Sequence, residues 1–432
     1  MARGSPRDFR HKLSVVADFV GGSPQNPHDD DCLLTLCSDA HHEATDDPEP
    51  QALRIIMEAT FWLCLMAATY SYFWYPLLLL ALPARKRRAG AQSAPVRKVA
   101  VIIAARNEAA KIVAKLDNTL ALERGVLDLD LIVASDASDD ATDSIVSGYA
   151  DRGIRLSRSP VRRGKEHAQG LAVASTDADV IVFTDAGTIL PPDALAHVVA
   201  AFDDPEVGAV SSIDRFLSAD GTLQGEGAYV RYEMWLRDLE TRFHSLVGLS
   251  GSFFAARRNV CARWDDRVQS DFGTALSCAQ LDLRAVSDRR LVGYYKDIAD
   301  SRKEYQRKVR TIVRGMNSLK IRAEVLNIVR YGRFSFEVFS HKVMRWATPA
   351  FLLGALAANI ALMIRHPVFR ILVVLQLAFY LTPVVARGMP GLRRIGPLRL
   401  AIYFVEVNLA ILHAAALVFA GRTILTWEPS KR

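Results

Sequence analysis

Long apolar stretches lie toward both ends of the chain and enclose a middle part in which apolar and polar residues alternate at shorter intervals. Ala59 to Leu82 contains 24 residues without a charged side chain. A helix of this length rises about 36 Å, which is enough to cross the hydrocarbon core of a bilayer. Three further apolar runs follow the middle part: Trp346–Ile364, Val368–Val385 and Leu398–Ala420. The pattern predicts one transmembrane helix, within residues 53–83, before the middle part and about three after it.

The middle of the chain alternates short apolar runs with amphipathic segments. Four runs have the length and composition of buried strands: Val99–Ala104, Leu129–Ala134, Ile154–Leu156 and Val180–Phe183. The segments between them have helical spacing, as in Lys165–Ala174. This strand–helix order predicts an α/β domain with a doubly wound, mostly parallel sheet, which we place at residues 96–330.

Polar residues directly follow three of the predicted strands. Arg106 and Glu108 follow the first strand, Asp136 follows the second and Asp185 ends the fourth. The carboxyl ends of parallel strands share one edge of the sheet, where ligands bind, so these side chains are expected to lie near one another. A carboxylate at this edge suits a divalent metal that carries phosphates. Taken alone, Asp185 and the Ala-Gly that follows it also fit an ordinary turn, but the clustering favours a site.

Two later segments carry candidate catalytic side chains. Asp271 stands at the start of a helical stretch, where it is either a helix cap or a functional carboxylate. Arg307, Arg310 and Arg314 are spaced i, i+3 and i+7, so they share one face of a helix. That basic face suits a diphosphate, and a simple solvated face is the alternative.

Two other segments also have helical patterns. Glu226, Glu233 and Glu240 recur every seven residues, so they share one face of a predicted helix, which is either solvated or the wall of a site. Residues Phe334–Trp346 are amphipathic and basic, which predicts a helix lying in the membrane interface. We therefore divide residues 331–432 into this interface helix and three transmembrane helices.

The net charge of +7 is unevenly distributed along the chain. Residues 1–52 are acidic and lack a sustained period, so we expect a disordered segment. From Arg85 to Lys98 there are six basic residues and no acidic one, beside the first apolar stretch. This favours a membrane surface over nucleic acid as a partner, and it places residues 96–330 in the cytoplasm and the N-terminal segment outside. The five cysteines lack metal-ligand spacing, so we expect neither a zinc site nor a disulfide framework.

Together these segments resemble the inverting family 2 glycosyltransferases of the membrane-integrated type, the group of cellulose, chitin, hyaluronan and poly-N-acetylglucosamine synthases. The resemblance covers residues 96–350. The segments that carry it are Val101 to Glu108, Ser135 to Asp140, Gly164-Lys165, Thr184 to Gly187, Ser270-Asp271 and Gln306 to Arg314. Gly187 stands where the DxD metal motif has its second carboxylate, and Ser270 stands where the ED pair has its first. The tryptophan of the QxxRW motif is also absent from its segment.

The resemblance implies a GT-A-like fold and an enzyme that moves a sugar from a nucleotide-diphosphate donor to a saccharide acceptor at the cytoplasmic face of the plasma membrane. It implies that Asp271 is the general base and that Arg310 or Arg314 neutralises the leaving diphosphate. The residues it assigns to the nucleotide are Arg106, Glu108, Asp136, Lys165 and Asp185. Asp185 is also expected to bind Mg²⁺ or Mn²⁺. Transfer of one sugar to a lipid carrier, and a non-catalytic membrane subunit that binds a nucleotide sugar, remain as alternatives.

Overall fold

The computed structural model describes residues 48–86, 93–217, 228–296, 301–364 and 366–423. The acidic N-terminal segment, for which we predicted disorder, lies almost wholly outside the described residues. Glu226 also lies outside them. The chain divides into two units, residues 1–56 and 57–432, and the contacts described below lie within residues 57–432.

The described strands form one seven-stranded sheet in the order β3-β2-β1-β4-β6-β5-β7. In chain order the strands are β1 (Lys98–Ala105), β2 (Asp128–Ser135), β3 (Ile154–Arg158), β4 (Val180–Asp185), β5 (Val207–Leu217), β6 (Phe253–Arg257) and β7 (Arg284–Lys296). Neighbouring strands are parallel, except that β6 runs antiparallel to both β4 and β5. The predicted α/β fold with a mostly parallel sheet is thus confirmed.

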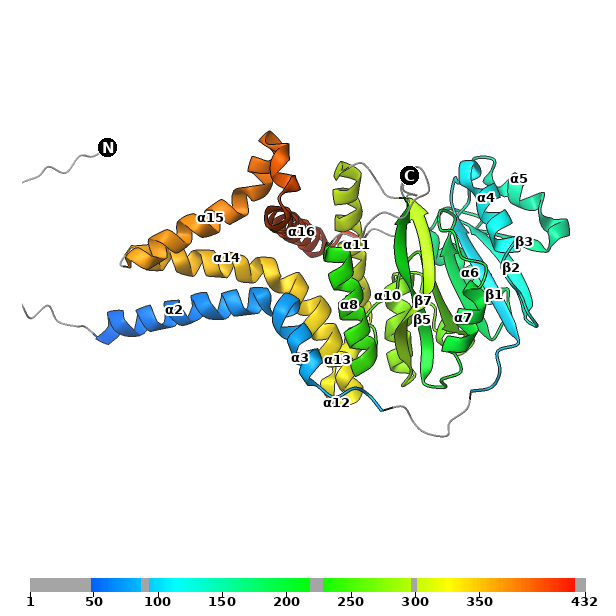
Figure 1. The fold of residues 1–432 in the computed structure, drawn as a ribbon, viewed down its shortest axis with the longest axis horizontal. Coiled ribbons are helices and arrows are strands. Elements are labelled where there is room, and N and C mark those ends of the chain that lie inside the picture. The colour runs from blue at the N-terminus through cyan, green and yellow to red at the C-terminus, as the bar shows by residue number, and fades with distance from the viewer. Residues whose placement is uncertain (1–47, 87–92, 218–227, 297–300, 365, 424–432) are drawn as a thin grey trace, which may run out of the picture. The chain divides into compact units, whose positions relative to one another are not determined.

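Helices cover both faces of the sheet (Figure 1). Side chains alternate along a strand, so Val101 and Ile103 of β1 point to one face while Ala100 and Ile102 point to the other. The first face is covered by α4 (Ala109–Leu120), α5 (Thr142–Ser147) and α7 (Ala194–Ala201). The second is covered by α6 (Lys165–Ala174), α9 (Arg258–Cys261) and α10 (Ser270–Gln280). A short 3-10 turn, η2 (Ala150–Arg152), leads into β3.

Four helical stretches of the described chain are long and apolar enough to cross a membrane: Gln51–Ala81, Arg333–Met363, Pro367–Gly388 and Gly396–Phe419. The prediction of one such helix before the sheet domain and three after it is therefore confirmed. The elements within them are α2 (Pro48–Thr69), η1 (Tyr70–Trp74), α3 (Tyr75–Ala81), α13 (Arg333–Val338), η4 (Phe339–Val343), α14 (Met344–Met363), α15 (Pro367–Gly388) and α16 (Gly396–Phe419). A 3-10 turn, η5 (Pro390–Arg394), precedes α16.

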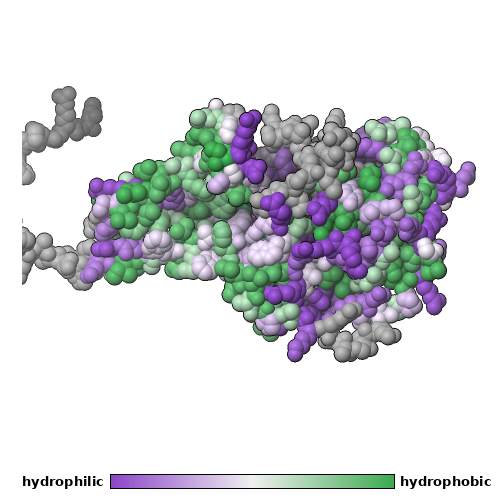
Figure 2. Space-filling model, viewed as in Figure 1, coloured by the Kyte–Doolittle hydropathy of each residue, from purple (hydrophilic) through white to green (hydrophobic). Residues whose placement is uncertain are grey.

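These helices have an apolar surface, whereas the surface of the sheet domain is polar. Leu353 of α14 and Val374 of α15 are exposed, and Figure 2 shows hydrophobic residues gathered over this part of the molecule. The segment predicted as an interface helix is helical in the structure and continues without a break through α14. Its role in the membrane interface stays a prediction.

Two helices join the sheet domain to the four candidate membrane spans, which we call the membrane-type helices. In α8 (Ala228–Phe243), Leu236 shares an apolar cluster with Tyr75 of α3. In α11 (Ser301–Ile321), Val313 shares another with Ala410 and Ala414 of α16. Between α11 and α13 the chain forms η3 (Ala323–Leu326) and α12 (Ile328–Tyr331). The face of α11 that is turned away from α16 is therefore available to the sheet domain.

Two π-helical turns face each other among the membrane-type helices. In η1, the Ser71 hydroxyl donates to the carbonyl of Ser340 in η4 at 2.7 Å. The Tyr70 and Ser340 hydroxyls also lie 3.0 Å apart. Such turns interrupt a helix at a cost in hydrogen bonding and occur often at functional sites.

Candidate active site

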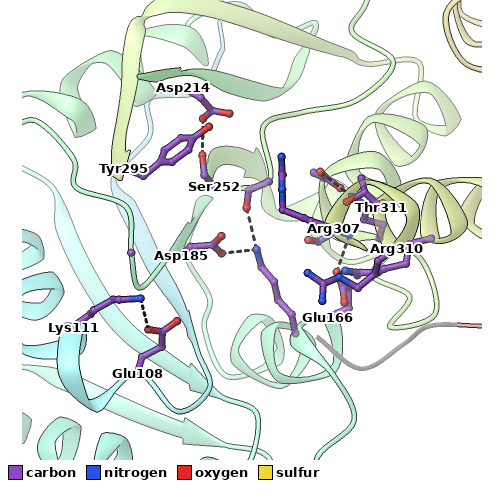
Figure 3. A pocket seen from close by; sticks show the side chains of 17 residues that line it. Glu108, Lys111, Glu166, Asp185, Asp214, Ser252, Tyr295, Arg307, Arg310 and Thr311 are labelled. Atoms are coloured by element: carbon purple, nitrogen blue, oxygen red, sulfur yellow. Dashed lines mark hydrogen bonds and ion pairs between the residues drawn. The ribbon is translucent and has the colours of Figure 1, made fainter. Parts of the chain in front are cut away.

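A polar pocket of about 230 Å³ lies at the carboxyl ends of β1 and β4 (Figure 3). β4 ends in Asp185, Glu108 follows β1, and α6, α10 and α11 supply most of the remaining wall. The wall includes the predicted site residues Glu108, Lys165, Asp185, Asp271, Arg310 and Arg314. It also includes residues that the sequence did not suggest: Glu166, Asp214, Gln269 and Tyr295. Segments that are far apart in the chain thus converge on one edge of the sheet.

Arg106 and Asp136 lie outside this wall. The Asp136 carboxylate accepts the backbone N–H groups of Arg163 at 2.9 Å and Gly164 at 3.0 Å, while Arg106 donates to the Asp136 carbonyl at 2.9 Å. Gly164 has a φ of 108°, a conformation that favours glycine, and it directly precedes α6. In this structure, Arg106 and Asp136 therefore hold the turn from which Lys165 reaches the pocket.

Lys165 bridges the two sides of the pocket. Its ammonium lies 2.5 Å from Oδ1 of Asp185 and donates to the carbonyl of Gly251 at 3.0 Å. The Lys165 side chain is 8% exposed, so most of its charge is shielded from water. An ammonium in this position offsets negative charge at the end of β4.

Glu166 ties three of the pocket helices together. Its carboxylate forms an ion pair with Arg314 of α11 and accepts the backbone N–H of Ser270 in α10 at 3.4 Å. The Glu166 side chain is 4% exposed, so the pair is largely buried and depends on both partners. Sequence reasoning missed Glu166, although it directly follows the Gly164-Lys165 motif.

Asp271 lies in the first turn of α10 and is half-buried. Its Oδ1 accepts the backbone N–H of Phe272 at 2.8 Å, and its Oδ2 accepts the Gln269 amide at 3.2 Å. Burial raises the pKa of Asp271, and the opposing effects of Lys165 and the Phe272 amide only partly offset that rise. A Cβ on Gly251 would lie 3.1 Å from Oδ2, so glycine leaves room on the pocket side of this carboxylate.

A fully buried lysine lies beneath the end of β4, where Asp185 is the last residue. The ammonium of Lys115, in α4, donates to the Thr188 carbonyl at 2.6 Å and to the Thr184 hydroxyl at 3.1 Å. Burial lowers the pKa of Lys115 to about 7, against the opposing effect of Asp185. The spacing of Ile112, Lys115 and Leu116 places this lysine on the buried face of α4, a signal that the sequence analysis did not use.

The donor set of the pocket suits a metal that arrives with phosphates. Among the described residues, no group of three or more His, Cys, Asp or Glu side chains could hold a metal ion alone. Asp185 nevertheless presents a 29% exposed carboxylate to the pocket. Mg²⁺ is commonly bound by one or two carboxylates, substrate phosphates and water, so Asp185 fits that arrangement and not an all-protein cage.

Comparisons with known proteins show which proteins this chain is similar to. Residues 100–264 match the model of the family "Glycosyl transferase family 2". The chain is 27% identical over 182 residues to a beta-monoglucosyldiacylglycerol synthase of Trichormus variabilis, covering 40% of this chain and 39% of that protein. It is 30% identical over 121 residues to a hyaluronan synthase of Streptococcus pyogenes, covering 26% of this chain and 29% of that protein. The chain thus spans well under half the length of either relative.

A solved structure shares the fold over most of the chain. It is the mannosyltransferase PcManGT from Pyrobaculum calidifontis, in complex with GDP-Man and Mn²⁺, with a TM-score of 0.63 and 23% sequence identity. The superposition covers 85% of this chain and 100% of that one. The mixed sheet, the pocket at its edge and the flanking apolar helices therefore define a GT-A-like domain carried on membrane-type helices. The domain belongs to family 2 of the glycosyltransferases.

Proposed function

We propose that the protein is an inverting glycosyltransferase that moves a sugar from a nucleotide-diphosphate donor to an acceptor at the cytoplasmic face of a membrane. The observation that carries this proposal is the composition of the pocket. Lys165, Arg310 and Arg314 line the same cavity as the carboxylates Asp185 and Asp271. Cations are needed where a diphosphate leaves, and a carboxylate is needed where a hydroxyl loses its proton.

The leaving diphosphate is stabilised by the cationic wall. Arg310 and Arg314 are four residues apart on α11, so their side chains lie on the same face of the helix and both line the pocket. Arg314 is also fixed by its buried ion pair with Glu166. A guanidinium held in place before the reaction stabilises developing charge without reorganising.

Asp271 is the proposed general base. Its raised pKa makes it a stronger base than an ordinary aspartate, while its half-buried position still lets it reach an acceptor hydroxyl in the pocket. In the reaction the acceptor oxygen forms a bond to the anomeric carbon as the bond to the diphosphate breaks. Attack in line with the leaving group inverts the anomeric centre.

Asp185 is the residue proposed to hold Mg²⁺ or Mn²⁺, as its carboxylate chemistry fits. When bound, such an ion supplies Lewis-acid stabilisation of the diphosphate. The related fold of PcManGT was solved with GDP-Man and Mn²⁺, which supports this choice of metal and of donor class. For the nucleoside we keep Glu108 as a pocket contact. Asp136 is kept as the proposed contact with the nucleobase and Arg106 as a nucleotide-binding residue, beside the turn that they stabilise.

We further propose that the protein is a multi-pass protein of the plasma membrane with its catalytic domain in the cytoplasm. Four candidate membrane spans support insertion in a membrane. The basic residues from Arg85 to Lys98 support a cytoplasmic position for the following domain. Its partners are then a nucleotide sugar, a saccharide or lipid-linked acceptor and the surrounding lipids, without a role for nucleic acid.

A donor panel tests the proposal. The protein purified in detergent is incubated with UDP- and GDP-sugars and Mg²⁺ or Mn²⁺, and the release of nucleoside diphosphate is measured. We expect release with at least one donor and a loss of release when EDTA removes the metal. Donor binding without release would support the non-catalytic subunit instead. Neither binding nor release with any donor would refute both.

A further inference from the structure

An apolar cavity of about 550 Å³ lies among the membrane-type helices, apart from the donor pocket. Its wall comes from α2, η1, α8, α14, α15 and α16 and includes Tyr72, Tyr229, Leu352, Phe379, Tyr403 and Phe404. This volume is within the range of small-molecule binding sites. All of these elements except α8 belong to the candidate membrane spans, so we expect the medium around the cavity to be hydrocarbon. An apolar chain is therefore the ligand that suits its walls.

A buried guanidinium lies against the cavity wall. Arg345 of α14 lies 5.0 Å above the ring of Tyr72, which is part of the cavity wall, and pairs with Glu233 of α8 at 2.8 Å. Its Nε and Nη2 are buried and have no hydrogen-bond partner among the described residues. Unpaired buried donors are costly, so these N–H groups call for oxygen atoms from a ligand or from water.

A row of basic side chains runs from Arg345 toward Asp271. Lys342 lies one turn before Arg345, and its ammonium is 5.5 Å from the ring of Phe272, the residue next to Asp271. Arg237 of α8 donates to the Gly248 carbonyl at 3.4 Å, and its Nε is another buried donor without a partner among the described residues. Arg237, Lys342 and Arg345 form a basic cluster between the wall of the apolar cavity and the proposed base.

The helix α11 also connects the two sites. Arg307 lines the donor pocket, and the next residue, Lys308, places its ammonium 4.4 Å from the ring of Tyr403 in the cavity wall. Successive residues of a helix point about 100° apart, so Arg307 and Lys308 lie on two different faces of α11. The wall of the apolar cavity therefore lies beside the helix that carries Arg310 and Arg314 of the donor pocket.

We propose that the acceptor is a membrane lipid, with a hydrocarbon chain in the apolar cavity and a hydroxylated polar head at the basic cluster. The inference rests on the proposed function. The lipid hydroxyl oxygen forms a bond to the anomeric carbon of the donor, and its proton passes to Asp271. The bond from that carbon to the diphosphate breaks, and the diphosphate leaves with the electron pair. The product is a glycolipid, and the nucleoside diphosphate is the second product.

The test follows a labelled sugar between two phases. The full-length protein is reconstituted in vesicles made from a bacterial total lipid extract, and a radiolabelled donor from the panel above is added with or without soluble oligosaccharides. We expect label to enter the organic phase on extraction, without any added oligosaccharide. Label that appears only in soluble saccharide, or only as free sugar, would overturn the lipid assignment while leaving the proposed sugar transfer or donor cleavage in place. Absence of both donor binding and turnover would overturn the proposed function itself.

A cavity-filling variant tests the location. Ala401→Phe adds an aromatic ring inside the cavity, and Leu412→Phe makes a similar change at a 43% exposed position of the same helix. We expect lipid labelling to fall at least about tenfold in Ala401→Phe relative to Leu412→Phe, since small changes in the shape of an apolar site alter turnover by such factors. Nucleotide titration of each variant shows that it is folded. Equal lipid labelling by the two folded variants would refute the assignment of this cavity.

Discussion

Lys115 offers a direct test of the electrostatics beneath the donor pocket. Lys115→Met keeps an unbranched apolar stem of similar length and removes the buried ammonium. The drop in its pKa from 10.5 to about 7 corresponds to roughly 5 kcal/mol of unfavourable free energy for the charged form in the folded protein. The substitution also leaves the Thr188 carbonyl without its donor, which costs about 1–3 kcal/mol at any pH.

The pH dependence separates these two effects. Between pH 7 and 10.5 the unfolded chain still holds the lysine proton that the folded protein has released, so the free energy of unfolding rises with pH. From pH 7 to pH 9 the gain is at most about 2.7 kcal/mol. For a domain of this size that is about 5–10 °C in Tm. Lys115→Met should lack this gain.

The assay is thermal unfolding in detergent at pH 7 and pH 9. Lys111→Met is the matched control, because Lys111 lies one turn earlier in α4 and its side chain is 33% exposed. We expect the wild type and Lys111→Met to gain several degrees relative to Lys115→Met on going to pH 9. If the Tm of all three proteins changes equally between pH 7 and pH 9, the pKa of Lys115 is not lowered. Our account of its buried contacts with Thr184 and Thr188 would then be wrong.

Three further predictions concern the site and its orientation. Asp271→Asn should lower turnover by about 10²–10⁴-fold with donor binding nearly intact. The control Asp282→Asn, at an exposed position just after the same helix, should not lower turnover. Near-normal turnover in Asp271→Asn would show that Asp271 is not the general base. Asp185→Asn should weaken the dependence on divalent metal and the binding of UDP or GDP, and titrations equal to the wild type would place the nucleotide site elsewhere. A cysteine at position 90 should react with an impermeant reagent only after the cells are opened, and labelling of intact cells would reverse the topology.

Much of the framework was predictable because it rests on local patterns. Apolar runs followed by carboxylates marked β1, β2 and β4, and the common edge of a parallel sheet brought Glu108 and Asp185 to one pocket. The i, i+3, i+7 spacing placed Arg310 and Arg314 on one face of α11, as the structure has them. Each of these inferences needed only the period of a helix or strand and the direction of neighbouring strands.

Other features depend on contacts between distant segments. Strand β6 lies between β4 and β5 and runs antiparallel to both. Its position and direction depend on how the chain connects the strands, and the residues of β6 do not indicate them. Glu240 is 1% exposed, accepts a hydrogen bond from the Tyr75 hydroxyl and has Nδ1 of His341 2.6 Å from its Oε1, so the solvated-face interpretation of the glutamates is wrong at this position. No local pattern indicates that residues 101 and 165 positions away from it will bury this carboxylate.

The contact between α11 and α16 has a consequence for how the protein senses its surroundings. Ala410 and Ala414 are small and one turn apart, so α16 approaches α11 closely at Val313. Val313 directly precedes Arg314, which lines the donor pocket. A change in bilayer thickness can be accommodated by helix tilt, and we expect a tilt of α16 to shift the segment of α11 that packs on it. If so, the same protein should turn over at different rates in thin and thick bilayers, because Arg314 follows Val313 directly.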